Sequence, residues 1–389
     1  MRRVSVGLSE ERDSRAAAAE AAGRAGAGLD GGCDLCLVFA SGEHLPLLGE
    51  LLSEVAGRLS PRNLIGCGAG GTLASGRELE RGPGLVVWAA SLPGVEVDTL
   101  VLPEERPGEE QPLFELPGSA ADSTDRAMIL LADPYRCSIE PWLEEISRTH
   151  PGLPVLGGLA SAALQDGSAI AALHDGELRS AGAAAALISG VQVLPCVSQG
   201  AAPVGPEMTV TAAERNVIGE LASKPAMERL GEVIAALPDS ERELAANGVL
   251  LGIVIDENRP EHERGDFLVR PIAGADRETG SIVLGERVRV GQTVRLHVRD
   301  AASADEDLRA ALRDQALALG PEGAAGALMF TCNGRGSHMF DLPDHDAGAL
   351  EDALGVPAAG FFCAGEIGPV GGRNFLHGFT ATLAVFPAS

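Results

Sequence analysis

Two cysteines stand in glycine-rich segments near the C-terminus, each with a histidine further along the chain. Cys332 is followed by Asn-Gly-Arg-Gly and Cys363 by Ala-Gly-Glu, with His338 and His377 downstream. A thiol beside an imidazole could act as a nucleophile. Nothing in the spacing fixes such a pair, and small buried thiols are common in protein cores. We therefore predict no catalytic residues, and a thiol-dependent enzyme stays an alternative.

The same segments carry charged side chains that could bind a small zwitterion. Arg335 and Arg373 could donate charge-assisted hydrogen bonds to a carboxylate, and Glu366 could accept them from an amino group. Glycine-rich turns bring backbone N–H groups close to a ligand, although glycines also allow tight turns and close strand packing. Local salt bridges are the alternative for the charged residues. The predicted ligand-binding residues, all in or beside glycine-rich segments, are Gly68, Gly70, Gly71, Gly157, Gly158, Cys332, Asn333, Arg335, Cys363, Gly365, Glu366, Gly371, Gly372, Arg373 and Asn374.

No metal site and no cofactor site is predicted. Cys33 and Cys36 form a CxxC, but no second CxxC or histidine pair follows at zinc-binding spacing, so we interpret both as small buried residues. No glycine-rich loop continues into Gly-Lys-Ser/Thr. The segment Gly66–Gly71 only loosely resembles the dinucleotide fingerprint and lacks its acidic partner.

Composition excludes several classes of protein. The chain has 389 residues, 30 basic and 55 acidic side chains, a net charge of −25 and only 3% aromatic residues. This length suggests two or three domains. The charge disfavours nucleic acid and anionic membrane surfaces, and scarce aromatics disfavour base stacking. With no signal-like start, no long apolar run and seven scattered cysteines, we expect a cytoplasmic protein without membrane insertion.

A strand–helix–strand–glycine pattern that could position these residues occurs three times, within residues 35–71, 128–161 and 327–369. Each helix is long enough to connect two parallel strands, although antiparallel placement stays possible. Ligands of open α/β sheets bind beyond the carboxyl ends of strands, and the glycine-rich segments follow these ends. The three copies therefore predict a pocket lined by their glycine loops.

The remaining pattern predicts a mixed α/β protein. Strand-like segments 85–90, 169–173 and 183–188 follow the first two copies, with a hairpin turn at 174–177 between the last two. Residues 102–125 predict a solvated loop, and the Gly/Pro-rich residues 199–206 mark a domain boundary. Further along, the pattern predicts helices at 225–236, 239–246 and 304–319 and strands at 249–255, 265–272 and 282–298. We predict mixed sheets with flanking helices in two related domains, 1–200 and 201–389.

Several segments together resemble the FIST sensory domain family. Residues 361–379 resemble its C-terminal signature, reading FFCAGEIGPVGG and then, after Arg373, NFLHGF. Residues 297–308 and the strand-loop 330–336 resemble segments that precede this signature. Residues 63–71 and 154–161 resemble the two glycine strand-loops of the N-terminal part. The resemblance implies a FIST N-terminal domain followed by a FIST C-terminal domain.

The resemblance also implies a function. It implies a small-ligand sensor in signal transduction, with amino acids as the ligand class. Family members are often fused to kinase, cyclase or chemotaxis modules, and we expect this chain to act on a separate signalling protein instead. The alternatives are a thiol-dependent enzyme acting on a small amino or carboxylic acid, and an interaction scaffold without a ligand.

Overall fold

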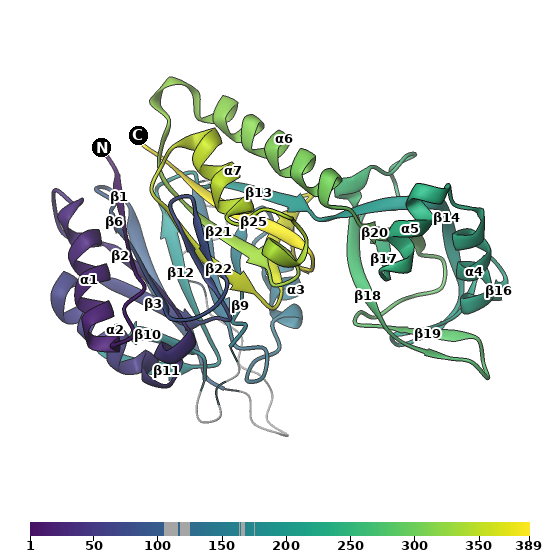
Figure 1. Ribbon diagram of the computed structural model, residues 1–389, viewed down its shortest axis with the longest axis horizontal. Helices are drawn as coiled ribbons and strands as arrows, with labels where there is room; N and C mark the ends of the chain where they lie inside the picture. The colour runs from purple at the N-terminus through teal and green to yellow at the C-terminus, as the bar shows by residue number, and fades with distance from the viewer. Residues whose placement is uncertain (105–115, 117–124, 163, 165–167, 175) are drawn as a thin grey trace. The chain divides into compact units, whose positions relative to one another are not determined.

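The computed structural model describes residues 1–104, 116, 125–162, 164, 168–174 and 176–389, so most of the predicted loop 102–125 lies outside the described residues. The chain forms two compact units, each described by itself (Figure 1). The first comprises residues 1–197, 308–376 and 381–389, and the second residues 198–307 and 377–380.

The first unit contains three copies of one folding pattern: strand, helix, parallel strand, hairpin and returning strand. Copy 1 consists of β2 (Leu35–Ser41), α2 (Leu48–Leu59), β3 (Asn63–Gly68), β4 (Thr72–Ala74), β5 (Arg77–Leu79) and β6 (Gly84–Ser91). Copy 2 consists of β8 (Arg126–Ala132), α3 (Glu140–Thr149), β9 (Val155–Leu159), β10 (Ile170–His174), β11 (Glu177–Ala181) and β12 (Ala183–Ser189). Copy 3 consists of β21 (Ala324–Cys332), α7 (His345–Leu354), β22 (Ala358–Cys363), β23 (Glu366–Val370), β24 (Arg373–His377) and β25 (Thr380–Pro387). The pairs β2–β3, β8–β9 and β21–β22 are parallel, which confirms the predicted crossovers.

The hairpin of each copy joins the sheet of another copy. Strand β4 pairs with β22, β10 with β3, and β23 with β9. Three six-stranded sheets result, with the orders β1-β6-β2-β3-β10-β11, β24-β23-β9-β8-β12-β7 and β13-β25-β21-β22-β4-β5. One outer strand of each sheet comes from outside the three copies: β1 (Arg3–Ser9), β7 (Glu96–Leu102) and β13 (Leu194–Gln199). The turn at 174–177 therefore joins β10 to β11, and the prediction that it joins residues 169–173 to 183–188 is wrong because β12 lies in a different sheet.

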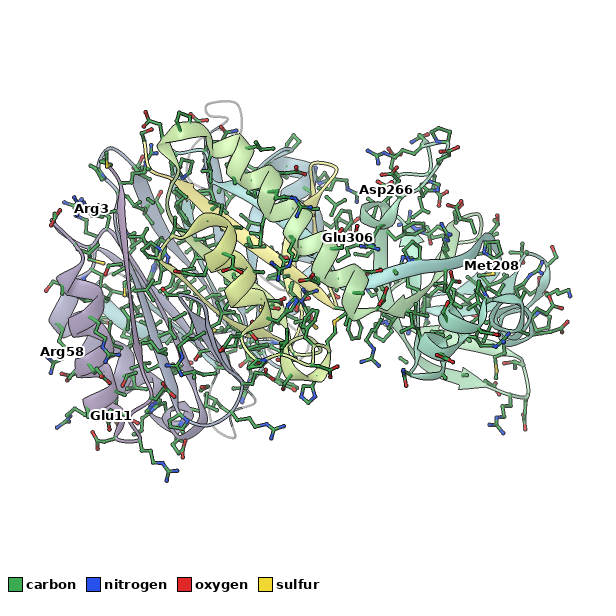
Figure 2. The ribbon with its side chains drawn as sticks, turned by 45° about the horizontal axis from the view of Figure 1, so that its top comes forward. Arg3, Glu11, Arg58, Met208, Asp266 and Glu306 are labelled. Atoms are coloured by element: carbon green, nitrogen blue, oxygen red, sulfur yellow. The ribbon has the colours of Figure 1, made fainter. Side chains whose placement is uncertain are left out.

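The three sheets share one core, and helices cover their outer faces. Phe39, Phe330 and Phe361 meet in this core, with ring centroids of Phe39 and Phe361 5.2 Å apart. On the outside, α1 (Ser14–Ala27) and α2 cover the first sheet, and buried leucines at helical spacing form the inner face of α2. Glu11 and Arg58 extend outward into solvent (Figure 2). Among the described residues, no helix has the length and apolar character needed to cross a bilayer.

One glycine recurs at the same place in all three copies. Gly66, Gly157 and Gly360 each stand in the second parallel strand, opposite a residue of the first strand in register. A Cβ there would lie 2.8, 1.9 and 1.6 Å from the carbonyl oxygens of Val38, Leu130 and Met329, the three register partners. The glycines therefore allow adjacent strands to approach, and Gly68, Gly157 and Gly158, predicted in loops, lie within strands.

The second unit is built on one seven-stranded sheet of order β14-β20-β17-β18-β19-β15-β16. Its strands are β14 (Ala201–Glu214), β15 (Val217–Leu221), β16 (Lys224–Pro225), β17 (Val249–Val254), β18 (Phe267–Asp276), β19 (Ser281–Leu284) and β20 (Thr293–Arg299). Helices α4 (Ala226–Ala236) and α5 (Asp239–Ala246) pack in its core, and α6 (Ala301–Leu319) starts in this unit. The strand-like residues 282–298 contain β19 and β20, and residues 199–206 are mostly strand. The domain boundary at residue 200 stays a prediction.

Replacement of the recurring glycine should destabilise the first unit. Gly360→Ala places a methyl group on the carbonyl oxygen of Met329, so we expect a loss of about 3 kcal/mol or more in the free energy of unfolding. Gly57→Ala is the matched control, because Gly57 is exposed in α2 with open space around it and should gain about 0.5–1 kcal/mol. Urea titration measures both. Equal stability of the two variants would contradict the close-approach explanation.

The hairpins β4–β5, β10–β11 and β23–β24, called exchanged hairpins here, each join the sheet of another copy. The two halves of the chain should therefore depend on each other for folding. A fragment of residues 1–225 lacks β22 and β23, and a fragment of residues 226–389 lacks β4 and β9. Fragment 1–225 keeps the whole β1-β6-β2-β3-β10-β11 sheet but leaves β4 and β9 without their partners, and fragment 226–389 leaves β22 and β23 without theirs. Neither fragment should therefore show a cooperative thermal transition by circular dichroism, while co-expression should restore one. A cooperative transition in either fragment alone would contradict the exchange.

Candidate functional site

The candidate site lies at the carboxyl ends of β21 and β22. Cys332 and Cys363 are the last residues of these parallel strands and are register partners, so their side chains lie next to each other on the same face. The N–H of Asn333 donates to the carbonyl oxygen of Cys363 at 2.9 Å. Two of the predicted segments are thus brought together.

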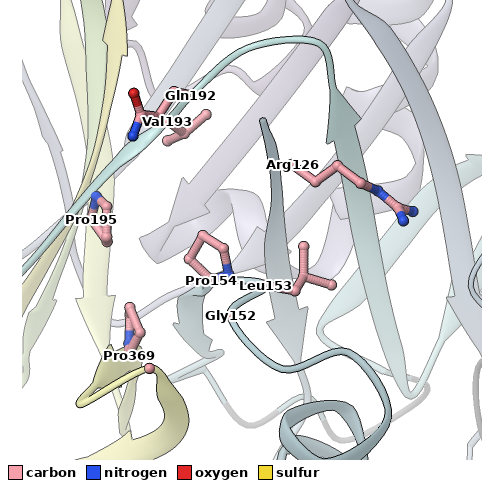
Figure 3. Close-up of a pocket in the computed structure, with 9 residues that line it drawn as sticks. Arg126, Gly152, Leu153, Pro154, Gln192, Val193, Pro195 and Pro369 are labelled. Carbon is pink, nitrogen blue, oxygen red and sulfur yellow. The ribbon is translucent and has the colours of Figure 1, made fainter. Parts of the chain in front are cut away.

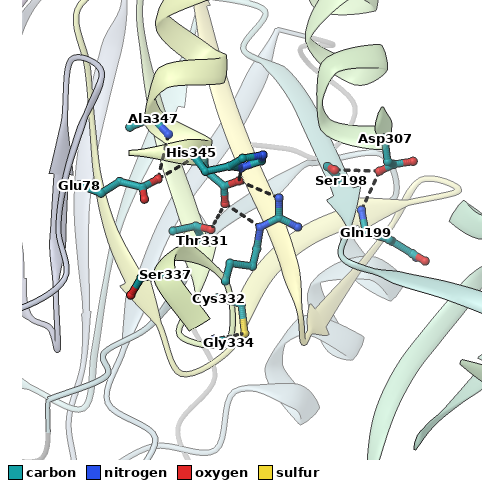
Figure 4. A network of polar contacts seen from close by, with 12 residues as sticks. Glu78, Ser198, Gln199, Asp307, Thr331, Cys332, Gly334, Ser337, His345 and Ala347 are labelled. Carbon is teal, nitrogen blue, oxygen red and sulfur yellow. Dashed lines mark hydrogen bonds and ion pairs between the residues drawn. The ribbon is translucent and has the colours of Figure 1, made fainter. Parts of the chain in front are cut away.

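A buried ion pair stands beside these strand ends (Figure 4). Arg335 and Asp346 are both fully buried, and the guanidinium donates from Nε and Nη2 to the two carboxylate oxygens at 2.6 and 2.8 Å. Thr331 Oγ1 donates to the same carboxylate at 2.5 Å, and His345 Nδ1 lies 2.9 Å from it. Burial alone would raise the pKa of Asp346, but the charge and hydrogen bonds of Arg335 hold it well below its ordinary value.

One nitrogen of the buried arginine is not used by this pair. Arg335 Nη1 is buried and has no hydrogen-bond partner among the described residues. The guanidinium lies over the ring of Phe340, with its carbon 5.2 Å from the ring centroid, and the charge of Glu366 also acts on it. A buried guanidinium nitrogen without an acceptor suits a ligand oxygen.

Glu366 reaches the site on the exchanged hairpin. It is the first residue of β23, fully buried, and pairs with Gly158 of β9. A Cβ on Gly158 would lie 2.4 Å from Cys363 Sγ, so glycine is needed there to leave room for the thiol. Burial, followed by the charge of Glu366, raises the pKa of Cys363 well above its ordinary value. Gly365 lies beside it and accepts from the N–H of Leu159 at 2.8 Å.

The glycine loop of copy 1 also reaches this place. The N–H of Gly70 donates to Ser161 Oγ at 2.8 Å, and that hydroxyl donates to the carbonyl oxygen of Phe362 at 2.5 Å. The carbonyl oxygen of Gly71 accepts from the N–H of Phe362 at 3.0 Å. Segments of all three copies therefore converge here. Gly68 instead packs against Leu45, whose side chain a Cβ would meet at 2.9 Å.

Four predicted residues lie elsewhere, in the turn and second strand of the β23–β24 hairpin. Gly371 and Gly372 have φ values of +57° and +76° and form the exposed turn. Arg373 is exposed and lies over the ring of Phe375. Asn374 is buried and anchors the chain before β9, donating to Leu153 O at 2.9 Å and accepting from the N–H of Val155 at 2.8 Å.

A surface pocket of about 330 Å³ lies at the opposite, amino ends of β8 and β9 (Figure 3). Its walls include three prolines, Leu153, Gln192 and the Arg126 side chain. Gly372 is the predicted site residue that lines it. The pocket is therefore separate from the site at the carboxyl ends of β21 and β22.

Sequence reasoning missed two acidic residues of the site, Asp346 and Glu78. Glu78 stands on the exchanged hairpin β4–β5, and its Oε1 accepts from the N–H groups of Asp346 and Ala347 at 2.9 and 3.0 Å, at the first turn of α7. Burial, and then the charge of Asp346, raises the pKa of Glu78 to about 7. The position of Asp346 at the start of a predicted helix could have indicated a polar contact there. Nothing in the sequence indicates which helix the Glu78 side chain contacts.

The fold and the sequence comparisons define the class of protein. The chain is a mixed α/β protein whose residues 34–224 match the FIST N domain and whose residues 226–369 match the FIST C domain. It therefore belongs to the FIST family, whose domains serve in sensing and signal transduction.

Similar proteins occur in mycobacteria. Uncharacterized protein Rv0628c of Mycobacterium tuberculosis strain H37Rv is 42% identical over 387 residues, covering 99% of both chains. Uncharacterized protein Mb0898c of Mycobacterium bovis is 41% identical over 387 residues, covering 99% of this chain and 98% of its own. The similarity thus extends over both compact units.

The raised pKa of Glu78 should make stability depend on pH. Its folded pKa of about 7 exceeds the ordinary 4.5, so the native state binds the proton more tightly between these values. Stability from this group therefore falls as pH rises from about 4.5 to 7, by on the order of 2–3 kcal/mol. Glu78→Gln should remove this slope from urea-denaturation curves measured between pH 5 and 8.

The exposed Glu351 of α7 supplies the matched control. Glu351→Gln should leave the wild-type slope in place. If Glu78→Gln and wild type show the same pH dependence, the carboxyl group of Glu78 does not titrate in this range.

Proposed function

We propose that this protein binds a small zwitterionic metabolite, an amino acid or a similar compound, at the carboxyl ends of β21 and β22. The observation that carries the proposal is the buried guanidinium of Arg335, whose Nη1 has no partner among the described residues. A ligand carboxylate there would add a charge-assisted hydrogen bond without disturbing the two bonds to Asp346. The proposal refines the sensory role of the family to a ligand class and a place.

Charge supports the choice of a zwitterion. The buried pair of Arg335 and Asp346 is neutral as a unit, and Glu366 adds a further carboxylate whose charge acts on Arg335. Burial of an ion is unfavourable unless opposite charge and hydrogen bonds compensate it. An ammonium group near Glu366 and a carboxylate near Arg335 would provide both. Ligands that carry a carboxylate alone should therefore bind more weakly than amino acids.

Access to the site requires local movement. Arg335 and Glu366 are fully buried, whereas Asn333 and Ala364 at the strand ends are exposed. We infer that the ligand enters between these two residues and favours one arrangement of the segment 333–338. A ligand shifts such an equilibrium only through its differential affinity for the two arrangements. The shifted arrangement would then be recognised by a separate signalling protein in the cytoplasm.

A thiol-dependent enzyme is the second candidate, and one observation favours it. The N–H of Gly334 points at Cys332 Sγ at 3.4 Å, a contact that stabilises a thiolate (Figure 4). Against it, burial keeps Cys363 protonated, which makes this second thiol a poor nucleophile. We therefore propose binding without turnover. If turnover of an amino or carboxylic acid is found and disappears in Cys332→Ser, the enzyme becomes the better explanation.

A thermal-shift screen with paired ligands tests the proposal. Each amino acid is compared with its analogue lacking the amino group. A specific amino acid should raise the melting temperature with concentration, by an amount equivalent to about 2.7 kcal/mol at 100 times its Kd. Glu366→Gln should weaken amino-acid binding at least about tenfold and leave the deaminated analogue unaffected.

Glu351→Gln, on the exposed face of α7, should bind both compounds as wild type does. Unchanged amino-acid affinity in Glu366→Gln would remove Glu366 from the site. No response to any amino acid or small carboxylate would favour the scaffold without a ligand.

A further inference from the structure

We propose that Cys332 and Cys363 form a reversible redox pair, oxidised by hydrogen peroxide to a disulfide that joins the ends of β21 and β22. The proposal concerns covalent chemistry of the protein itself and does not depend on ligand binding. It stands on the register of the two strands, the space around the sulfurs and the different surroundings of the two thiols.

Strand register brings the two thiols together. Cys332 and Cys363 are directly paired across adjacent parallel strands, so their Cα atoms are separated by the strand spacing of about 4.8 Å and their side chains project on one face. Disulfides span Cα distances of about 4.4–6.8 Å. The residues two positions earlier, Phe330 and Phe361, are likewise register partners and contact each other in the core. The bond therefore requires side-chain rotation without movement of the strands.

The surroundings leave space for the sulfurs. A Cβ on Gly158 would lie 2.4 Å from Cys363 Sγ, so the glycine in β9 leaves the space that this sulfur needs. Both cysteines are reduced in the structure. The Cys363 thiol donates to its own strand at Phe361 O, 3.6 Å away, a weak contact that a disulfide would replace.

The two thiols differ in a way that assigns their roles. Cys332 receives the N–H of Gly334, is 9% exposed and is next to the exposed Asn333. Cys363 is fully buried, with a pKa raised by that burial. Thiolates react with peroxide, whereas a protonated buried thiol does not. Cys332 is therefore the peroxide-reactive thiol and Cys363 the resolving one.

Oxidation of the two thiols takes two steps. The Cys332 thiolate attacks one peroxide oxygen, the O–O bond breaks, and the departing hydroxide takes a proton to become water, which leaves a sulfenic acid on Cys332. Cys363 then passes its proton to the hydroxyl of the adjacent sulfenic acid, and its sulfur bonds to the Cys332 sulfur as the S–O bond breaks and water leaves. The neighbouring hydroxyl group thus accepts the proton that burial otherwise keeps on Cys363. Two thiols are oxidised and one peroxide is reduced to two waters.

Peroxide treatment of the full chain, followed by alkylation of remaining thiols and peptide mass mapping, tests the pair. We expect a peptide pair linked through Cys332 and Cys363 that disappears on treatment with dithiothreitol, while Cys137 and Cys196 remain alkylated. The CxxC cysteines, Cys33 and Cys36, are the internal comparison, because they are also buried and lie close together in the sequence. Linkage of Cys33 to Cys36 in place of the proposed pair, or no linked peptide, would overturn the proposal.

Two further measurements guard against a misfolded variant. In Cys363→Ser, peroxide should oxidise Cys332 only as far as a sulfenic acid, which dimedone traps. The control Cys196→Ser should form the linked peptide as wild type does. On the unmodified protein, phenylarsine oxide, which bridges neighbouring thiols, should block formation of the linked peptide. Continued linkage after this reagent, or a sulfenic acid on Cys332 that persists in wild type, would show that the two sulfurs do not meet.

Discussion

Backbone hydrogen bonds between each parallel strand pair and a hairpin from another copy hold the first unit together. Strands β3, β9 and β22 each leave an edge that their own copy cannot cover, because the chain turns away into its hairpin. The hairpin of a different copy supplies the missing pairing. An uncovered edge would expose unsatisfied N–H and C=O groups, so the three copies are stable only as a set. The halves named FIST N and FIST C are accordingly parts of one unit in this region.

The same exchange assembles the candidate site. The hairpin β4–β5 brings Glu78 to the first turn of α7, and β23 brings Glu366 to the buried face beside Cys363. Arg335 and Asp346 form an ion pair that contains no residue of either hairpin. Glu78 and Glu366, one from each hairpin, both act on this pair. A buried ion pair of this kind adds little net stability compared with apolar packing. Its burial, with one guanidinium nitrogen that has no partner among the described residues, supports the proposed role in ligand recognition.

The repeated units and their parallel strands could be predicted from sequence, because apolar strands and amphipathic helices follow one another at matching distances. The excess of glycine also had a structural meaning. At Gly66, Gly157 and Gly360 the glycine allows two strands to approach closely, whereas the sequence predicts glycine-rich ligand-binding loops. The exchange could not be predicted, since hairpins such as β4–β5 carry no mark of the sheet they join. For the site, residue type alone grouped Arg335 with Arg373, although one is buried against Asp346 and the other is exposed in a hairpin. The different surroundings of these two arginines follow from the pairing of strands that are distant in the sequence, which residue type does not reveal.

A crystal structure of the protein with its best-binding amino acid would show directly where the ligand lies. We expect electron density for the ligand between Arg335 Nη1 and the carboxylate of Glu366, with the two bonds between Arg335 and Asp346 kept. Density in the pocket beside Leu153 and Pro369, with no ligand contact to Arg335, would contradict this expectation.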